Sequence, residues 1–138
     1  MNKLQIDKEA MVSIAKQMRE RAYAPYSKFN VGACIMADDG TFFGGCNVEN
    51  AAYGVAVCAE TTAICSMIAA GKKKIMAIAV IDSGNKIASP CGRCRQAIRE
   101  FALPDTIIYL CDNKGEICKT VTIDELLPMS FGPEYLNV

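Results

Sequence analysis

The chain begins with apolar residues spaced three and four positions apart, which places them on one face of a helix. Asp7 stands where a helix N-cap belongs, and Pro25 closes the segment. The apolar face consists of Met11, Ile14, Ala15, Met18 and Ala22. We therefore predict an amphipathic helix that starts after Asp7 and ends before Pro25.

Five short runs of apolar and β-branched residues predict strands. They cover residues 31–37, 41–46, 75–81, 106–111 and 116–121. The first two flank Asp38-Asp39-Gly40, a sequence typical of a hairpin turn. The third run is almost wholly apolar, as in a strand that is buried on both faces.

Two further helices are predicted to begin at cysteines. Residues 58–70 end at Gly71, a typical C-cap residue, and residues 91–102 are stopped by Pro104. The remaining segments are a loop at 47–57, a short helix at 123–127, and a tail with Phe131, Tyr135 and Leu136. Strands that alternate with helices indicate one α/β domain over residues 1–138, with at least one parallel crossover.

Composition narrows the class of protein. Hydrophobic residues make up 51% of the 138 residues and charged residues 22%, as in globular proteins. The 15 basic and 15 acidic side chains cancel, which argues against binding held mainly by nucleic-acid phosphates. Residues 1–22 show no secretory signal pattern, and no run approaches the roughly 20 apolar residues of a membrane span. We expect a soluble, cytoplasmic protein that binds neither nucleic acid nor membrane.

Cysteine and histidine usage restricts the possible chemistry. The chain has eight cysteines and no histidine. In a reducing compartment the cysteines are not expected to form disulfides, so a subset is expected to bind metal or to react. The absence of histidine excludes Ser-His and Cys-His catalysis, and it excludes every metal site with a histidine ligand. Thiolates and carboxylates must therefore carry the chemistry.

Three cysteines stand at positions typical of a zinc site. Cys58 begins one predicted helix, and Cys91 and Cys94 form a Cys-x-x-Cys at the start of another. Thiolates are favoured at helix N-termini by free amides and by the helix dipole. Three protein ligands fill three corners of a zinc tetrahedron and leave the fourth for water, as in catalytic sites.

Glu60 supplies a candidate proton carrier beside this metal. On a regular helix, the side chains of two residues that are two positions apart point about 200° away from each other. Cys58 and Glu60 can face one metal only if Cys58 lies at the helix cap, where the backbone is not yet helical. With that geometry, Glu60 lies near the zinc without binding it and moves protons between water and substrate, as in zinc deaminases.

Four motifs, in order along the chain, resemble the cytidine deaminase superfamily. They are Tyr26-Ser27-Lys28-Phe29-Asn30-Val31-Gly32-Ala33, Cys46-Asn47-Val48-Glu49-Asn50-Ala51-Ala52-Tyr53-Gly54, Cys58-Ala59-Glu60 with Pro90-Cys91-Gly92-Arg93-Cys94-Arg95-Gln96, and Phe131-Gly132-Pro133 with Leu136. The resemblance implies a three-layer sandwich in which a mixed five-stranded sheet has helices on both faces. It also implies hydrolysis of free cytidine and 2′-deoxycytidine in pyrimidine salvage, by zinc-activated attack at C4 with Glu60 as proton shuttle.

The resemblance also implies roles for individual residues. Asn47 and Glu49 match positions that hydrogen-bond the ribose 3′-hydroxyl, and buried polar groups that lose such partners cost about 1–3 kcal/mol each. Phe29 matches an aromatic residue that packs against the pyrimidine, and the backbone of Ala59 helps to hold the base. These positions imply a nucleoside substrate rather than a bare base.

Three further positions imply a shared active site. Ala51 and Tyr53 match residues that a neighbouring subunit donates toward the 5′-hydroxyl, and Phe131 matches an aromatic residue that closes the pocket from another subunit. The resemblance therefore implies a homotetramer that binds one zinc ion per subunit.

One departure from the family concerns charge. Many members with three cysteines carry arginine directly after the glutamate, where this chain has Thr61. Zinc with three thiolates has a net charge of −1, and two helix N-termini offset it by about half a charge each. Arg93, inside the Cys-x-x-Cys, is the further candidate for compensation.

Other interpretations stay open from the sequence. Blasticidin-type deaminases also resemble residues 91–96, including Arg93. A nucleic-acid-editing deaminase, a thiol redox pair at Cys91 and Cys94, and a closed structural zinc site with Cys65 as fourth ligand are the remaining alternatives. The cysteines outside the metal site are predicted to be small buried residues. They are Cys34, Cys46, Cys65, Cys111 and Cys118.

Overall fold

A mixed five-stranded sheet organises the computed structural model, which describes residues 5–136. Its strands are β1 (Val31–Ala37), β2 (Phe42–Cys46), β3 (Ile75–Asp82), β4 (Ala102–Cys111) and β5 (Ile117–Thr122). The order across the sheet is β2-β1-β3-β4-β5. Only β3 and β4 pair in parallel, and the other neighbours are antiparallel. The predicted hairpin start and parallel crossover are both confirmed.

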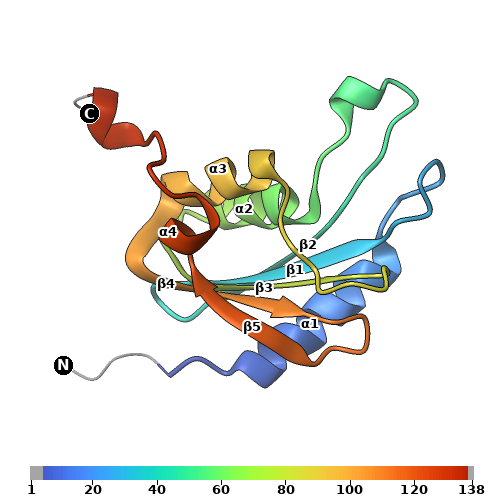
Figure 1. The fold of residues 1–138 in the computed structure, drawn as a ribbon, viewed down its shortest axis with the longest axis horizontal. Helices are drawn as coiled ribbons and strands as arrows, with labels where there is room; N and C mark the ends of the chain where they lie inside the picture. Colours follow the sequence, from blue (N-terminus) through green and yellow to red (C-terminus); the bar gives the residue numbers. More distant parts are fainter. Residues whose placement is uncertain (1–4, 137–138) are drawn as a thin grey trace.

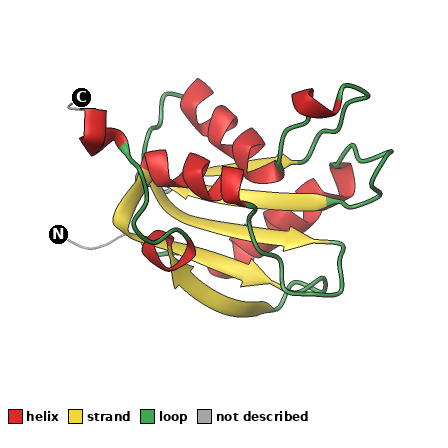
Figure 2. Ribbon diagram, turned by 45° about the horizontal axis from the view of Figure 1, so that its top comes forward, coloured by secondary structure: helices red, strands yellow, loops and turns green. Residues whose placement is uncertain are grey.

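Helices cover both faces of this sheet, as Figures 1 and 2 show. The helices are α1 (Lys8–Arg21), α2 (Ala59–Ala69), α3 (Gly92–Phe101) and α4 (Ile123–Leu126), with 3-10 turns η1 (Tyr53–Val55) and η2 (Pro133–Leu136). The Asp7 carboxylate accepts a hydrogen bond from the Ala10 amide (3.0 Å) and caps α1 as predicted. The three-layer α/β fold is confirmed.

Each layer of helices has its own apolar core. On the α1 face, Met11 and Ala15 pack with buried side chains of β1 and β3. On the opposite face, Ala63 and Met67 of α2 and Ile98 of α3 pack against the other side of the same strands. Strand β3 therefore contributes to both cores, which explains its nearly continuous apolar sequence.

Strand β4 differs from the prediction, because it begins at Ala102 rather than at residue 106. The pairing with β3 jumps from Ala102 to Ile107, so the intervening residues leave the regular ladder. This irregularity accommodates Pro104, which has no amide hydrogen to donate. The buried Thr106 hydroxyl accepts from the Leu103 amide (2.7 Å) and donates to the Ile75 carbonyl (2.5 Å), which holds the irregular segment in place.

The prediction that the remaining cysteines are buried is wrong for two of them. Cys34 and Cys111 are buried and Cys46 is half-buried, but Cys65 and Cys118 are exposed. Cys65 lies on the outward side of α2, whose inward side carries Ala63, Ile64 and Met67. Cys118 lies on β5, a strand at the edge of the sheet. Among residues 5–136, no helix has both the length and the apolar character needed to cross a bilayer.

Candidate metal centre and substrate pocket

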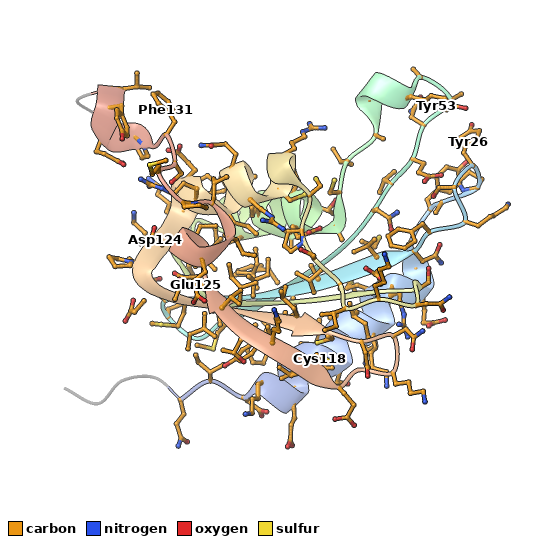
Figure 3. The ribbon with its side chains drawn as sticks, viewed as in Figure 1. Tyr26, Tyr53, Cys118, Asp124, Glu125 and Phe131 are labelled. Carbon is orange, nitrogen blue, oxygen red and sulfur yellow. The ribbon has the colours of Figure 1, made fainter. Side chains whose placement is uncertain are left out.

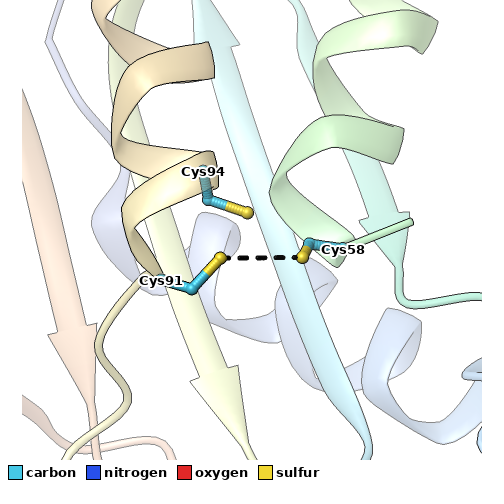
Figure 4. Close-up of side chains that lie close together, drawn as sticks. All are labelled: Cys58, Cys91 and Cys94. Carbon is cyan, nitrogen blue, oxygen red and sulfur yellow. Dashed lines mark hydrogen bonds between the residues drawn. The ribbon is translucent and has the colours of Figure 1, made fainter. Parts of the chain in front are cut away.

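Three thiols converge where α2 and α3 begin (Figure 4). Cys58 is the N-cap of α2 and Cys91 the N-cap of α3, and both have an extended backbone, with ψ angles of 158° and 168°. Cys94 lies in the first turn of α3. Their sulfur atoms all lie within 4.8 Å of one another, so the structure brings together the three predicted ligands.

The spacing of the sulfur atoms fits zinc. Zn–S distances near 2.3 Å in a tetrahedral site place two sulfurs about 3.8 Å apart. The sulfurs of Cys58 and Cys91 are 3.9 Å apart. Within the part of the chain that the structure describes, this group has no fourth Cys, His, Asp or Glu, and Cys65 lies outside it. The geometry therefore does not support a closed site with four protein ligands.

The surroundings of the thiols differ. Burial raises the pKa of the Cys58 thiol, and burial together with the nearby Glu60 carboxylate raises that of Cys94. Burial acts to raise the pKa of the Cys91 thiol as well. Hydrogen bonds from the backbone and thiol of Cys94, and from other neighbouring donors, outweigh this effect, so the pKa of Cys91 is lowered. A divalent cation compensates the cost of burying such thiolates, so metal binding and proton release are coupled here.

Glu60 lies beside the thiols, as the sequence argument required. Cys58 occupies the non-helical cap position, so both side chains face the same cavity. The Glu60 side chain is only 3% exposed, and burial raises the pKa of its carboxyl. Interaction with the Cys94 thiol opposes that shift. A buried carboxyl beside a metal site is suited to taking up and releasing protons.

A cavity of about 430 Å³ opens above Glu60 and the thiols. This volume falls in the range of small-molecule sites. Segments from the β1 start, the 47–57 loop, the end of β3 and both helix N-termini surround it. The residues that line it are Ser27, Phe29, Val31, Asn47, Glu49, Tyr53, Ala56, Val57, Cys58, Ala59, Glu60, Val80, Asp82, Ser89, Cys91, Arg93 and Cys94.

Asn47 connects the cavity wall to the start of β1. Its Oδ1 accepts from the Val31 amide (2.8 Å), and its Nδ2 donates to the Phe29 carbonyl (2.8 Å). One N–H of the amide group remains for a ligand. The side chain therefore supports the backbone that carries Phe29 in addition to facing the cavity.

Glu49 is held by the turn before β1. Its Oε1 accepts from the amides of Tyr26 (3.0 Å) and Ser27 (3.1 Å), and its Oε2 accepts from the Ser27 hydroxyl. The Ser27 hydroxyl, desolvation and these amides act on Glu49 together, and the net effect lowers the pKa of its carboxyl. Glu49 is thus an ionised acceptor in a fixed orientation. Ser27 helps to hold it there, which the sequence did not indicate.

The predicted shared-site residues lie on two separate projections. Tyr53 lines the cavity and is 77% exposed, and its ring contacts Tyr26 edge-on with ring centroids 6.0 Å apart. Ala51 is exposed on the same loop and lies outside the cavity lining. Phe131 also lies outside the lining, on the C-terminal segment at the opposite end of the helical layer (Figure 3).

The two arginines of α3 near the thiols have different surroundings. Arg93 is exposed, lines the cavity and donates from Nη1 to the Ala56 carbonyl at 3.4 Å. Arg95, which the sequence argument did not single out, is half-buried and donates three hydrogen bonds. The sequence could not indicate these hydrogen bonds, because two of the three acceptors are backbone carbonyls, which every residue type has.

Comparison with known proteins identifies the family. The model of the "cytidine and deoxycytidylate deaminase zinc-binding region" matches residues 5–111 of this chain. This match includes the helix N-termini that carry all three thiols. The chain belongs to the cytidine and deoxycytidylate deaminase family. It is therefore a member of a family of zinc-dependent enzymes, and the three thiols form a cluster suited to the metal.

Members of this deaminase family resemble the chain along nearly its full length. A cytidine deaminase from Sporosarcina psychrophila is 44% identical over 132 residues, which cover 96% of each chain. The crystal structure of cytidine deaminase from Burkholderia pseudomallei superposes with a TM-score of 0.85 at 42% identity and covers 91% of this chain and all of that one. A blasticidin-S deaminase from Bacillus cereus is 34% identical over 113 residues, 76% of this chain and 79% of its own.

Proposed function

We propose that the protein hydrolyses free cytidine and 2′-deoxycytidine to uridine and 2′-deoxyuridine, with release of ammonia, as a step of pyrimidine salvage. The observation that carries this proposal is the buried Glu60 carboxyl at the floor of a nucleoside-sized cavity, directly beside three convergent thiols. The resemblance to cytidine deaminases over nearly the whole chain supports the choice of base. The eight free thiols suit a cytoplasmic enzyme.

Each side chain at the floor of the cavity has a separate task. Cys58, Cys91 and Cys94 hold the zinc ion, which supplies Lewis-acid chemistry that lowers the pKa of water toward neutrality. Glu60 takes a proton from the attacking water and passes it to N3 of the cytosine. Once the C4–O bond has formed, Glu60 takes the second proton from the new hydroxyl group at C4 and delivers it to the amine. The C4–N bond then breaks as the C4 carbonyl forms, so that one water is consumed and one ammonia is released. Arg93 and the two helix N-termini offset part of the thiolate charge.

The wall of the cavity orients the nucleoside. The Phe29 ring packs against the pyrimidine, and the backbone of Ala59, buried at the start of α2, holds the base. The free N–H of Asn47 and the fixed carboxylate of Glu49 bind the ribose 3′-hydroxyl. Because these two polar groups already have backbone partners, they present their remaining hydrogen-bonding capacity in a defined direction.

We further propose a homotetramer in which neighbouring subunits complete each site. Ala51 and Tyr53 reach toward the 5′-hydroxyl of a neighbour's substrate, and Phe131 closes the pocket of another subunit. Tyr53 (77% exposed) contacts the exposed Tyr26, and Phe131 (54% exposed) stacks on the exposed Tyr135. These paired exposed rings support the arrangement, because contiguous exposed apolar surface marks interaction sites. A pocket that closes over the 5′-hydroxyl accepts a free nucleoside and excludes an oligonucleotide.

The deciding experiment adds cytidine to purified protein and follows the ultraviolet change to uridine and the release of ammonia. The Glu60→Ala variant is expected to keep about one zinc per chain and to lose turnover by about 10²–10⁴-fold, as for removal of a general acid–base group. Wild-type protein that binds zinc and releases no ammonia would show a structural or redox module instead. Equal rates on cytidine and on a short oligonucleotide would contradict the free-nucleoside assignment.

Blasticidin S is the second candidate substrate, because a blasticidin-S deaminase is 34% identical and residues 91–96 resemble that group of enzymes. The 47–50 segment favours cytidine, since Asn47 and Glu49 match a ribose site. Comparing kcat/KM for the two compounds separates these proposals. A higher value for blasticidin S would transfer the assignment to the analogue.

A further inference from the structure

The guanidinium of Arg95 gathers three segments around the start of α3. Its Nε donates to the Pro90 carbonyl (2.8 Å), and its Nη2 donates to the Ser89 hydroxyl (2.8 Å). Its Nη1 donates to the Leu126 carbonyl (2.7 Å) at the end of α4. One rigid group therefore joins α3, the segment that enters it, and α4.

These contacts fix the peptide that leads into Cys91. Pro90 directly precedes Cys91, and its carbonyl is held by the Arg95 side chain, while the Arg95 amide donates to the Cys91 carbonyl (3.0 Å). Arg95 thus binds the carbonyl oxygens on both sides of the Cys91 α-carbon. The extended backbone of Cys91, with φ −67° and ψ 168°, aims its sulfur at the other two thiols.

We propose that Arg95 is a positioning residue for the metal ligand Cys91. It holds the peptide before Cys91 in the one orientation that places this sulfur 3.9 Å from the sulfur of Cys58. Partners of this kind behind a metal ligand orient the ligand and raise the affinity for the metal, so their loss is expected to speed metal release. The inference rests on the proposed function only in taking Cys91 as a zinc ligand, and it is independent of the substrate.

Geometry and charge make different predictions for a lysine at this position. None of the ion pairs formed by residues 5–136 includes Arg95, so its positive charge has no carboxylate partner there. If Arg95 acted through charge alone, Arg95→Lys would preserve its effect. A lysine has a single nitrogen and cannot span the Pro90 carbonyl, the Ser89 hydroxyl and the Leu126 carbonyl in the way that the planar guanidinium does.

The test measures zinc release from the holoenzyme into a metallochromic chelator, without nucleoside and well below the unfolding temperature. Arg95→Gln and Arg95→Lys are both expected to release zinc about ten- to a hundredfold faster than the wild type. Ser89→Ala removes one of the three contacts and is expected to accelerate release about two- to tenfold. If the Arg95 variants do not fold, the rate of zinc release from Ser89→Ala tests the proposed role of Arg95 instead.

Two controls separate this role from general stability. Arg21→Gln removes an equal charge from an exposed position on α1, in the opposite layer. Val12→Ala leaves a small cavity in the α1 core and lowers the unfolding temperature. Both are expected to release zinc at the wild-type rate.

Three results would overturn the inference: wild-type release from Arg95→Gln, wild-type release from Arg95→Lys, or, where neither folds, wild-type release from Ser89→Ala. Wild-type protein that holds zinc but does not deaminate cytidine would reject the proposed substrate alone. The role of Arg95 would then still be decided by zinc release.

Discussion

Single side chains in the cavity wall support the backbone and also face the cavity. The Oδ1 of Asn47 accepts from the Val31 amide, and its Nδ2 donates to the Phe29 carbonyl. Both the oxygen and the nitrogen of the side-chain amide are therefore required. Glu49 uses only acceptors, on the amides of Tyr26 and Ser27 and on the Ser27 hydroxyl. The two residues therefore differ in how they tolerate a change of side-chain chemistry.

Asn47→Asp tests the double role of this residue. Aspartate keeps the acceptor for Val31 but sets a second oxygen against the Phe29 carbonyl, where Asn47 donates across 2.8 Å. We expect the free energy of unfolding to fall by about 1–3 kcal/mol, measured by urea denaturation, and KM for cytidine to rise. Asn50→Asp is the control, because Asn50 only accepts from the Ala52 amide (2.9 Å). Equal stability of the two variants would contradict the argument.

At the scale of elements, two glycines let helices lie directly on the strands. A β-carbon on Gly45 of β2 would lie 2.4 Å from the Ala63 amide nitrogen and 2.5 Å from the Ala59 carbonyl oxygen. A β-carbon on Gly32 of β1 would lie 1.9 Å from the Ala15 carbonyl oxygen of α1, in the opposite layer. Both positions meet helix backbone, which cannot rotate out of the way as a side chain does.

Substituting these two glycines separates stability from metal binding. Gly45→Ala and Gly32→Ala are each expected to lower the free energy of unfolding by about 1–3 kcal/mol or more, the usual cost of overpacking. Only Gly45→Ala displaces α2, the helix that carries Cys58 and Glu60, so only this variant is expected to bind zinc more weakly in a chelator competition assay. Equal loss of zinc affinity in Gly32→Ala would show that the metal site follows overall stability.

The elements also show how far the sequence alone leads. The bounds of β1 and the caps at Asp7 and Cys58 were predicted correctly, because hydrophobic periodicity and capping chemistry are local. The start of β4 was not, because its pairing jump around Pro104 depends on the partner strand β3.

At the metal site, too, local features of the sequence could be predicted and contacts that depend on the fold could not. The three thiols and Glu60 could be predicted because residue type and spacing along single helices carry the signal. The hydrogen bonds of Arg95 could not be predicted, because its partners are mainly backbone carbonyls, whose positions only the fold determines.

Across the whole molecule, the C-terminal segment is fastened to α3 while its aromatic rings face outward. Arg99 donates to the Ser130 hydroxyl (2.8 Å) and forms an ion pair with Glu134. Gln96 donates to the Phe131 carbonyl (2.9 Å). Phe131 and Tyr135 stack with ring centroids 5.2 Å apart, and both are more than half exposed. The segment therefore holds Phe131 in a fixed and exposed position, as the proposed contact with another subunit requires.

Mixed assemblies test whether Phe131 acts on a neighbour's site. Glu60→Ala and Phe131→Ala chains, each expected to be weakly active alone at low cytidine concentration, are co-expressed with different tags and purified as mixed oligomers. If the two residues of a site come from different chains, random mixing restores both wild-type residues in about a quarter of the sites. Uridine formation should then rise toward about a quarter of the wild-type rate, whereas oligomers of either variant alone should keep only their weak activity. If both residues act within one chain, every site keeps one defect and mixing restores nothing.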